Sequence, residues 1–141
     1  MLVFLASIQG FSQSSKVNLT GVILTDSGQP AEGVSVALKG TAYSTLTNEK
    51  GEYKFFTLRP VAYPGRQNPE HIHVTIKEPD KNEYWIDEYL FDDDPILTDK
   101  ERKNCQDRGG SGIIKVKDVG NMLKAERNIY LGKNIPDYPK K

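Results

Sequence analysis

The sequence predicts an all-β domain: a β-sandwich that carries one short helix. Three observations predict it. Short segments alternate apolar and polar residues with a period of two, as strands with one buried face do. Clusters of Gly, Pro, Asn and Asp separate these segments, as turns between strands do. No helical period occurs in the first half of the chain, and 141 residues suit one domain with its own core.

The first half of the chain supplies four predicted strands. Residues 18–24 alternate loosely, and residues 34–38 place an apolar side chain at every second position. Two further strands at 43–47 and 53–58 flank an Asn-Glu-Lys-Gly turn at 48–51. Together these segments indicate a prealbumin-like or immunoglobulin-like β-sandwich, which defines a fold and not a function.

The second half is predicted to hold a proline-rich loop, two strands, one helix and a terminal hairpin. In chain order the strands cover 71–77 and 83–91, the helix 98–108, and the hairpin strands 113–117 and 123–131. Thr98 or Asp99 caps the helix, and the glycine run after it ends it. The aromatic side chains of Tyr84, Trp85 and Tyr89 could line a pocket, an interface or the core, and the core is the default location.

Charge and cysteine content restrict the classes of partner. Lys plus Arg and Asp plus Glu both number 19, so the formal net charge is zero. This balance gives no reason to expect binding to nucleic acid or to an anionic membrane surface. The single cysteine, Cys105, lies in a polar run, and we interpret it as a bystander rather than a nucleophile. The sequence leaves the oligomeric state open, and a homo-oligomer is among the outcomes that it allows.

The first residues form a short apolar run at 1–8, followed by small and polar residues. A bilayer span needs about 20 apolar residues, whereas this run resembles the hydrophobic region of a secretory signal peptide without its basic leader. We therefore expect residues 1–15 to be the remnant of a signal peptide, residues 16–141 to form the domain, and the protein to be exported, either periplasmic or secreted. A first β-strand is the alternative interpretation of this run.

His71 and His73 are the two histidines of the chain, and they lie two residues apart on one predicted strand. The period of two places both imidazoles on the same face, with Cα atoms about 6.6–6.8 Å apart. Both can therefore bind one metal ion, while Ile72, Val74 and Ile76 keep the opposite face for the core. Two surface histidines without a metal remain the alternative for this pattern alone.

Tyr63-Pro64 precedes the first histidine in a proline-rich loop that also holds Arg66. A phenol, with a reference pKa of about 10, becomes a good ligand when a strongly charged cation displaces its proton. Fe(III) does this well, whereas the usual ligands of zinc do not include tyrosine. Two imidazoles with a tyrosinate thus indicate ferric iron, and Arg66 would offset negative charge beside it. An ordinary strand-edge tyrosine and an exposed arginine are the alternatives.

The stretch from Tyr53 through Arg59-Pro60 and Tyr63-Pro64 to His71-Ile72-His73 resembles the signature region of intradiol ring-cleavage dioxygenases, the protocatechuate and catechol type. The similarity continues through Phe-Asp-Asp-Asp-Pro at 91–95 and Arg-Gly-Gly-Ser-Gly at 108–112, and it covers roughly residues 21–139.

The resemblance implies that Tyr63, His71 and His73 are three of the family's four iron ligands. The fourth ligand in the family is a second tyrosine, which lies well before the Tyr-Pro turn and after a connecting segment that this chain largely lacks. Tyr43 is the nearby candidate in the right order, since Tyr53 corresponds to a family tyrosine that packs rather than ligates.

The resemblance also implies an enzyme that uses Fe(III) and O₂ to cleave the aromatic ring of a catechol-type substrate. Tyr43 would accept a substrate proton, and Arg66 would steady negative charge on the ring or product. The expected partners are the small-molecule substrate and O₂, with no nucleic acid and no membrane. The alternative function is a non-catalytic prealbumin-like binding module that has lost turnover.

Overall fold

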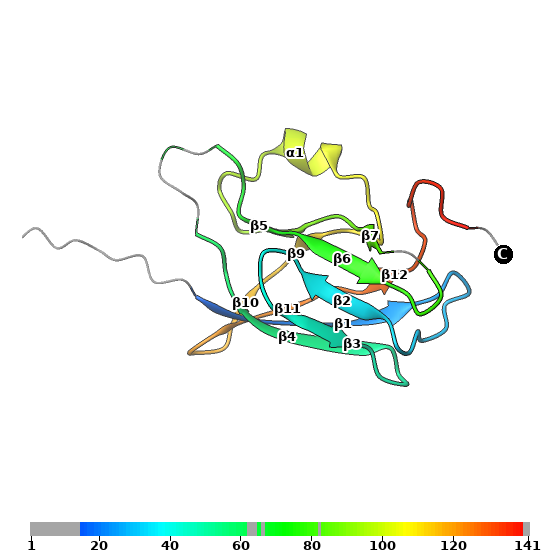
Figure 1. Cartoon of the computed structure of the whole chain (residues 1–141). Helices are drawn as coiled ribbons and strands as arrows, with labels where there is room; N and C mark the ends of the chain where they lie inside the picture. The colour runs from blue at the N-terminus through cyan, green and yellow to red at the C-terminus, as the bar shows by residue number, and fades with distance from the viewer. Residues whose placement is uncertain (1–14, 62–64, 66, 82, 140–141) are drawn as a thin grey trace, which may run out of the picture.

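The computed structural model describes residues 15–61, 65, 67–81 and 83–139. This part of the chain forms twelve strands and one helix, which confirms the predicted fold class (Figure 1). In chain order the elements are β1 Lys16–Leu24, β2 Ser35–Leu38, β3 Ser44–Leu46, β4 Glu52–Leu58, β5 His71–Ile72, β6 Val74–Lys77, β7 Tyr84–Trp85, β8 Tyr89–Phe91, α1 Asp99–Asn104, β9 Ile113–Ile114, β10 Lys117–Asp118, β11 Leu123–Glu126 and β12 Ile129–Tyr130.

The strands form three sheets around one core. In the largest, β4 pairs antiparallel with one edge of β1, and β11 and β12 pair parallel with the other edge. The second sheet has the order β3-β2-β6-β7 and the third β5-β8-β9. In Figure 1 β4 lies on one side of the molecule and α1 on the opposite side. No helix in the described ranges has the length and apolar character of a membrane span.

The buried side chains follow the alternation that the sequence predicts. Val34, Val36 and Leu38 are all at most 2% exposed, and β4 buries Tyr53 and Phe55 while the residues between and after them face outward. The same cluster takes in apolar side chains from the other sheets, among them Val17, Leu19, Ile23, Ile72, Val74, Ile76, Tyr89, Phe91, Ile114 and Ile129.

A buried polar network joins the sheets. The Tyr53 hydroxyl donates to the carbonyl of Arg127 at 2.6 Å and lies 2.8 Å from the Tyr89 hydroxyl. The Arg127 guanidinium donates to the carbonyl of Asp87 at 2.7 Å and lies over the Tyr89 ring. Burial, followed by the neighbouring Tyr89, raises the pKa of Tyr53 well above its usual value. Tyr53 is therefore a neutral packing residue, as the family resemblance implies.

The prediction of one strand over 71–77 is wrong, because the chain changes sheets at His73. β5 pairs with β8 in the third sheet, whereas β6 pairs with β2 and β7 in the second. The segment 83–91 divides in the same way into β7 and β8. Strands that pass from one sheet to another bend at the transition, and alternation along one strand does not reveal such a bend. Thr75, which a single continuous strand would place on the same face as the histidines, is buried.

The helix begins as predicted and ends earlier. Thr98 caps α1 through the backbone N–H of Glu101, and the Glu101 carboxylate accepts the N–H of Thr98 in return. The helix ends at Asn104 rather than at 108, because the backbone groups that follow bond elsewhere: the Asp107 N–H donates to the Asp87 carboxylate at 2.7 Å. Burial raises the pKa of the Cys105 thiol, which agrees with its interpretation as a bystander.

The terminal hairpin is confirmed only in part. β10 pairs antiparallel with β11 around the turn at 119–122. β9 instead pairs parallel with β8, and β12 pairs parallel with β1. β9 and β12 are therefore parts of different sheets, because each pairs with a strand that lies far away in the sequence.

Candidate metal centre

His71 and His73 lie where the chain passes from the third sheet to the second. The buried side chains of Ile72 and Val74 anchor the backbone on either side of His73, and the His73 carbonyl accepts the N–H of Lys39 at 2.9 Å. The two imidazole centroids are 4.9 Å apart with an interplanar angle of 79°. The structure therefore brings both predicted histidine ligands together, although they do not share one strand.

Glu88 is a third potential ligand that the sequence did not reveal. Its Oε1 lies 2.6 Å from the Nδ1 of His73, and His71, His73 and Glu88 each offer a ligand atom within 4.8 Å of the others. Glu88 lies in the connection between β7 and β8, and no short spacing motif links it to the histidines. The side chains of His73 and Glu88 are 46% and 38% exposed, so the cluster is open to solvent.

Four charged residues fix the backbone that leads into His71. The N–H of Glu70 donates to the carboxylate of Asp94 at 2.7 Å, and Asp94 is only 4% exposed. Arg59 donates to the Glu70 carboxylate at 2.5 Å and makes a bidentate pair with Asp93. The Arg-Pro segment at 59–60 and the Asp-Asp-Asp-Pro segment at 92–95 are separate motifs in the sequence. In the fold they meet beside the first histidine.

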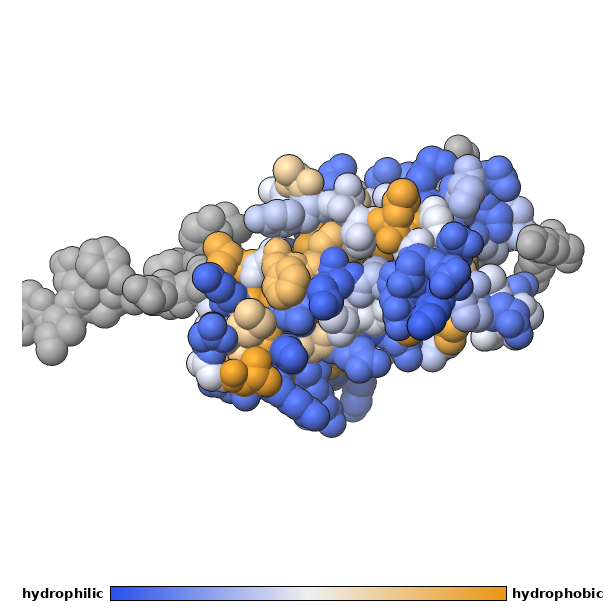
Figure 2. Space-filling view, turned by 90° about the horizontal axis from the view of Figure 1, so that it is seen from below, coloured by the Kyte–Doolittle hydropathy of each residue, from blue (hydrophilic) through white to orange (hydrophobic). Residues whose placement is uncertain are grey.

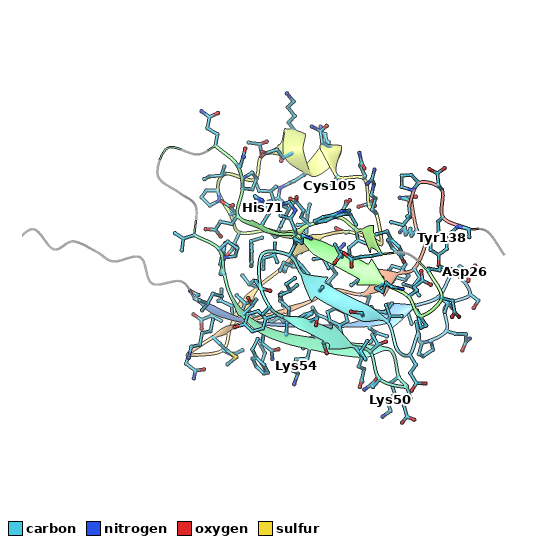
Figure 3. The ribbon with its side chains drawn as sticks, in the orientation of Figure 1. Asp26, Lys50, Lys54, His71, Cys105 and Tyr138 are labelled. Carbon is cyan, nitrogen blue, oxygen red and sulfur yellow. The ribbon has the colours of Figure 1, made fainter. Side chains whose placement is uncertain are left out.

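The side of the molecule that carries His71 lies toward α1, away from Lys54 of β4 (Figure 3). The ring of Trp85 packs edge-on against His73 with centroids 5.8 Å apart. Trp85 is 47% exposed, so the default assignment of this residue to the core is wrong, whereas Tyr89 is buried as expected. The exposed indole instead flanks the histidine cluster.

The other predicted site residues are placed differently. Tyr63 and Arg66 lie outside the residues that the structure describes. Tyr43 is 52% exposed and shares a shallow hollow with apolar side chains that include Phe56, Leu58 and Met122, and neither histidine lines this hollow. Figure 2, which shows this lower face, has apolar side chains gathered there. The role of Tyr43 as a ligand and base stays a prediction.

Fold and site together define a class: an all-β sandwich with a solvent-open pair of histidines that can hold a metal ion. Neither a protein-family model nor a curated protein sequence matches this chain. Solved structures do match it, and all of those described below are dioxygenases.

The chain superposes on the dioxygenase domain of a dioxygenase carbohydrate-binding protein fusion from Streptomyces sp. SirexAA-E with a TM-score of 0.66 and 18% identity, covering 88% of this chain and 84% of that one. For hydroxyquinol 1,2-dioxygenase from Pseudomonas putida DLL-E4 the TM-score is 0.64 and the identity 16%, and the superposition covers 85% of this chain and 57% of that one. For catechol 1,2-dioxygenase from Acinetobacter sp. ADP1 the TM-score is 0.65 and the identity 14%, and the superposition covers 94% of this chain and 58% of that one.

These similarities confirm the predicted resemblance at the level of the fold: the chain has the fold of the intradiol ring-cleavage dioxygenases. It spans most of the Streptomyces domain but only 57% and 58% of the hydroxyquinol and catechol enzymes.

Proposed function

We propose that the protein is an Fe(III)-dependent intradiol dioxygenase that cleaves the aromatic ring of a catechol-type substrate with O₂. The convergence of His71 and His73 on one solvent-open region, with ring centroids 4.9 Å apart, is the observation that carries the proposal. The shared fold supports it, because all three compared proteins are named as dioxygenases.

The donor atoms of this region fit a metal ion. The Nδ1 of His71 lies 2.8 Å from the carbonyl of Pro69, and a carbonyl can only accept, so Nδ1 carries the proton and Nε2 keeps its lone pair for an ion. The Nδ1 of His73 lies 2.6 Å from the Glu88 carboxylate, so its Nε2 is the ring nitrogen left for an ion. Neutral imidazoles with free nitrogens are suitable ligands for iron.

The predicted site residues would have different roles in this reaction. His71, His73 and Tyr63 would hold the iron, which when bound supplies Lewis acidity that lowers the pKa of the catechol hydroxyls. Tyr43 would accept a substrate proton at its phenolate oxygen, and Arg66 would steady negative charge. The roles of the two tyrosines and of Arg66 rest on the family resemblance. The half-exposed His73 leaves the site accessible to a dissolved substrate.

The visible spectrum of the protein loaded with ferric iron tests this function. We expect a broad tyrosinate-to-iron band that shifts when catechol is added, followed by O₂ uptake. His71→Ala and Tyr63→Phe should each weaken or remove the band, whereas Tyr130→Phe, on β12, is a matched control that should retain it. A colourless protein without bound iron would overturn the proposal and leave a non-catalytic β-sandwich binding module.

We also propose that the protein is exported, with residues 1–15 as the remnant of its signal peptide. Expression in a Gram-negative host of the chain with a short basic leader added before Met1, followed by fractionation and N-terminal sequencing, tests this. Recovery from the periplasm with a new N-terminus near residue 16 is the expected result, and an intact chain in the cytoplasm would contradict it.

A further inference from the structure

We propose that Glu88 is a positioning residue of the metal centre: its carboxylate lies against the Nδ1 edge of His73 and so turns Nε2 of that ring toward the metal ion. This inference rests on the proposed function only in taking His73 as a metal ligand. Glu88 itself belongs to no motif that the sequence displays.

The first argument is the short contact between the two side chains. The Glu88 Oε1 and His73 Nδ1 atoms are 2.6 Å apart, the distance of an ion-pair contact. A carboxylate oxygen is attracted to a protonated ring nitrogen and repelled by a nitrogen lone pair, so this contact favours the ring form with the proton on Nδ1 and the lone pair on Nε2. His71 reaches the same state through the Pro69 carbonyl. Two rings with different partners therefore expose the same nitrogen.

The second argument is that both members of the pair are held in place. The Asp87 carbonyl, one residue before Glu88, accepts a bond from buried Arg127 at 2.7 Å. The N–H of Leu90, two residues after it, donates to the carbonyl of Gly112 at 2.9 Å. The ring of His73 is contacted edge-on by Trp85. Glu88 thus acts from a fixed backbone on a ring that is itself packed.

The third argument separates a positioning role from direct ligation. Metal-bound histidines in proteins usually donate their second ring N–H to a carboxylate or carbonyl, and removing that partner typically weakens metal binding by about 10–100-fold. Glu88 and Pro69 supply one such acceptor to each ring. A direct ligand would instead have to place an oxygen on the Nε2 side of the His73 ring, whereas the contact of Glu88 is with Nδ1.

Zinc binding to the full chain, produced without a histidine tag, tests the proposal by calorimetric titration. Glu88→Ala should weaken binding by about 10–100-fold, whereas Glu88→Gln should stay within about threefold of wild type, because the amide oxygen still accepts the Nδ1–H. Glu83→Ala removes an exposed carboxylate from a nearby segment and is the control that should change nothing.

Long-range ¹H–¹⁵N NMR of the metal-free protein gives a second readout that does not depend on metal or activity. The chain has two histidines, so two imidazole patterns are expected. Both rings should carry the Nδ1 proton in wild type and in Glu88→Gln, and only His73 should lose this preference in Glu88→Ala. His71 serves as the internal reference in every spectrum.

The outcomes are distinguishable. If Glu88→Gln binds zinc as weakly as Glu88→Ala, Glu88 is a direct ligand and the positioning role is wrong. If Glu88→Ala changes neither the affinity nor the His73 tautomer, Glu88 plays no part in the site. Zinc binding that matches these expectations in a protein that takes up no iron would support the positioning role while the dioxygenase proposal fails.

Discussion

The carboxylate of Asp94 accepts the backbone N–H of Glu70 at 2.7 Å, so a residue that follows β8 fixes the peptide immediately before His71. The other oxygen of Asp94 accepts the N–H of Ile96 at 2.9 Å. A single buried side chain therefore satisfies two backbone donors and connects the aspartate-rich turn to the histidine pair.

Asp94→Ala should reduce both stability and metal affinity. The substitution leaves two backbone donors without their acceptor, which we expect to lower the free energy of unfolding by about 1–3 kcal/mol. Urea denaturation and zinc titration measure the two effects. Asp26→Ala, in the exposed turn after β1, is the control. Unchanged zinc affinity in a destabilised Asp94→Ala protein would show that Asp94 supports the fold but not the histidines.

Gly112→Ala should disturb the segment that carries Glu88. A Cβ at this position would lie 1.9 Å from the carbonyl oxygen of Glu88, a distance that requires the backbone to move. We expect lower thermal stability together with weaker zinc binding, because overpacking of this kind costs about 1–3 kcal/mol or more. Gly120→Ala is not a clean control because Gly120 has a φ of 100°; Lys115→Ala, at an exposed position after β9, is preferable.

Stability should fall steeply above pH 10. Burial raises the pKa of Tyr53 and of Tyr89 in the folded chain, whereas the unfolded chain titrates near about 10. A raised folded pKa means that the contribution is complete below about pH 10 and is lost as pH rises toward the folded value, by about 1.4 kcal/mol per pH unit for each group.

Urea denaturation between pH 8 and pH 12, with absorbance at 295 nm to follow tyrosinate, measures this dependence. Part of the tyrosine absorbance should appear only as the protein unfolds. Tyr53→Phe should flatten the slope, and Tyr130→Phe is the exposed comparison. A slope in Tyr53→Phe equal to that of wild type would contradict the prediction.

Tyr43→Phe tests the proposed base. In the iron-loaded protein we expect it to lower the rate of ring cleavage by about 10²–10⁴-fold, the usual contribution of positioned proton transfer. Because Tyr43 is half exposed, the fold should be unaffected, and circular dichroism checks this. An unchanged visible band and rate in Tyr43→Phe would mean that Tyr63 alone supplies the phenolate.

The alternation of apolar and polar residues located the strands in which one face is buried and the other is more exposed along the whole length. Residues 34, 36 and 38 are an example, because all three side chains enter the core. Alternation does not reveal the change of sheet at His73. The apolar pattern of Ile72, Val74 and Ile76 continues unbroken, while the hydrogen-bonding partners change from β8 to β2 and β7. Pairing between distant strands is not encoded in the spacing of one segment.

For the candidate site as well, the sequence identified some of the residues and missed another. The two histidines were identifiable because they are close in sequence and share a residue type suited to metals. Glu88 was not, because its approach to His73 depends on how β7 and β8 join different sheets. Its carboxylate is one of 19 acidic side chains, and only the fold distinguishes it from the others.

The transition between sheets at His73 gives a bound ion a mechanical role. His71 belongs to β5 of the third sheet, and the His73 backbone is bonded to Lys39 next to β2 of the second. An ion held by both rings would therefore act as a cross-link between two sheets, and its binding energy would oppose their separation. At an ion concentration a hundred times the Kd, this linkage adds about 2.7 kcal/mol to the free energy of unfolding.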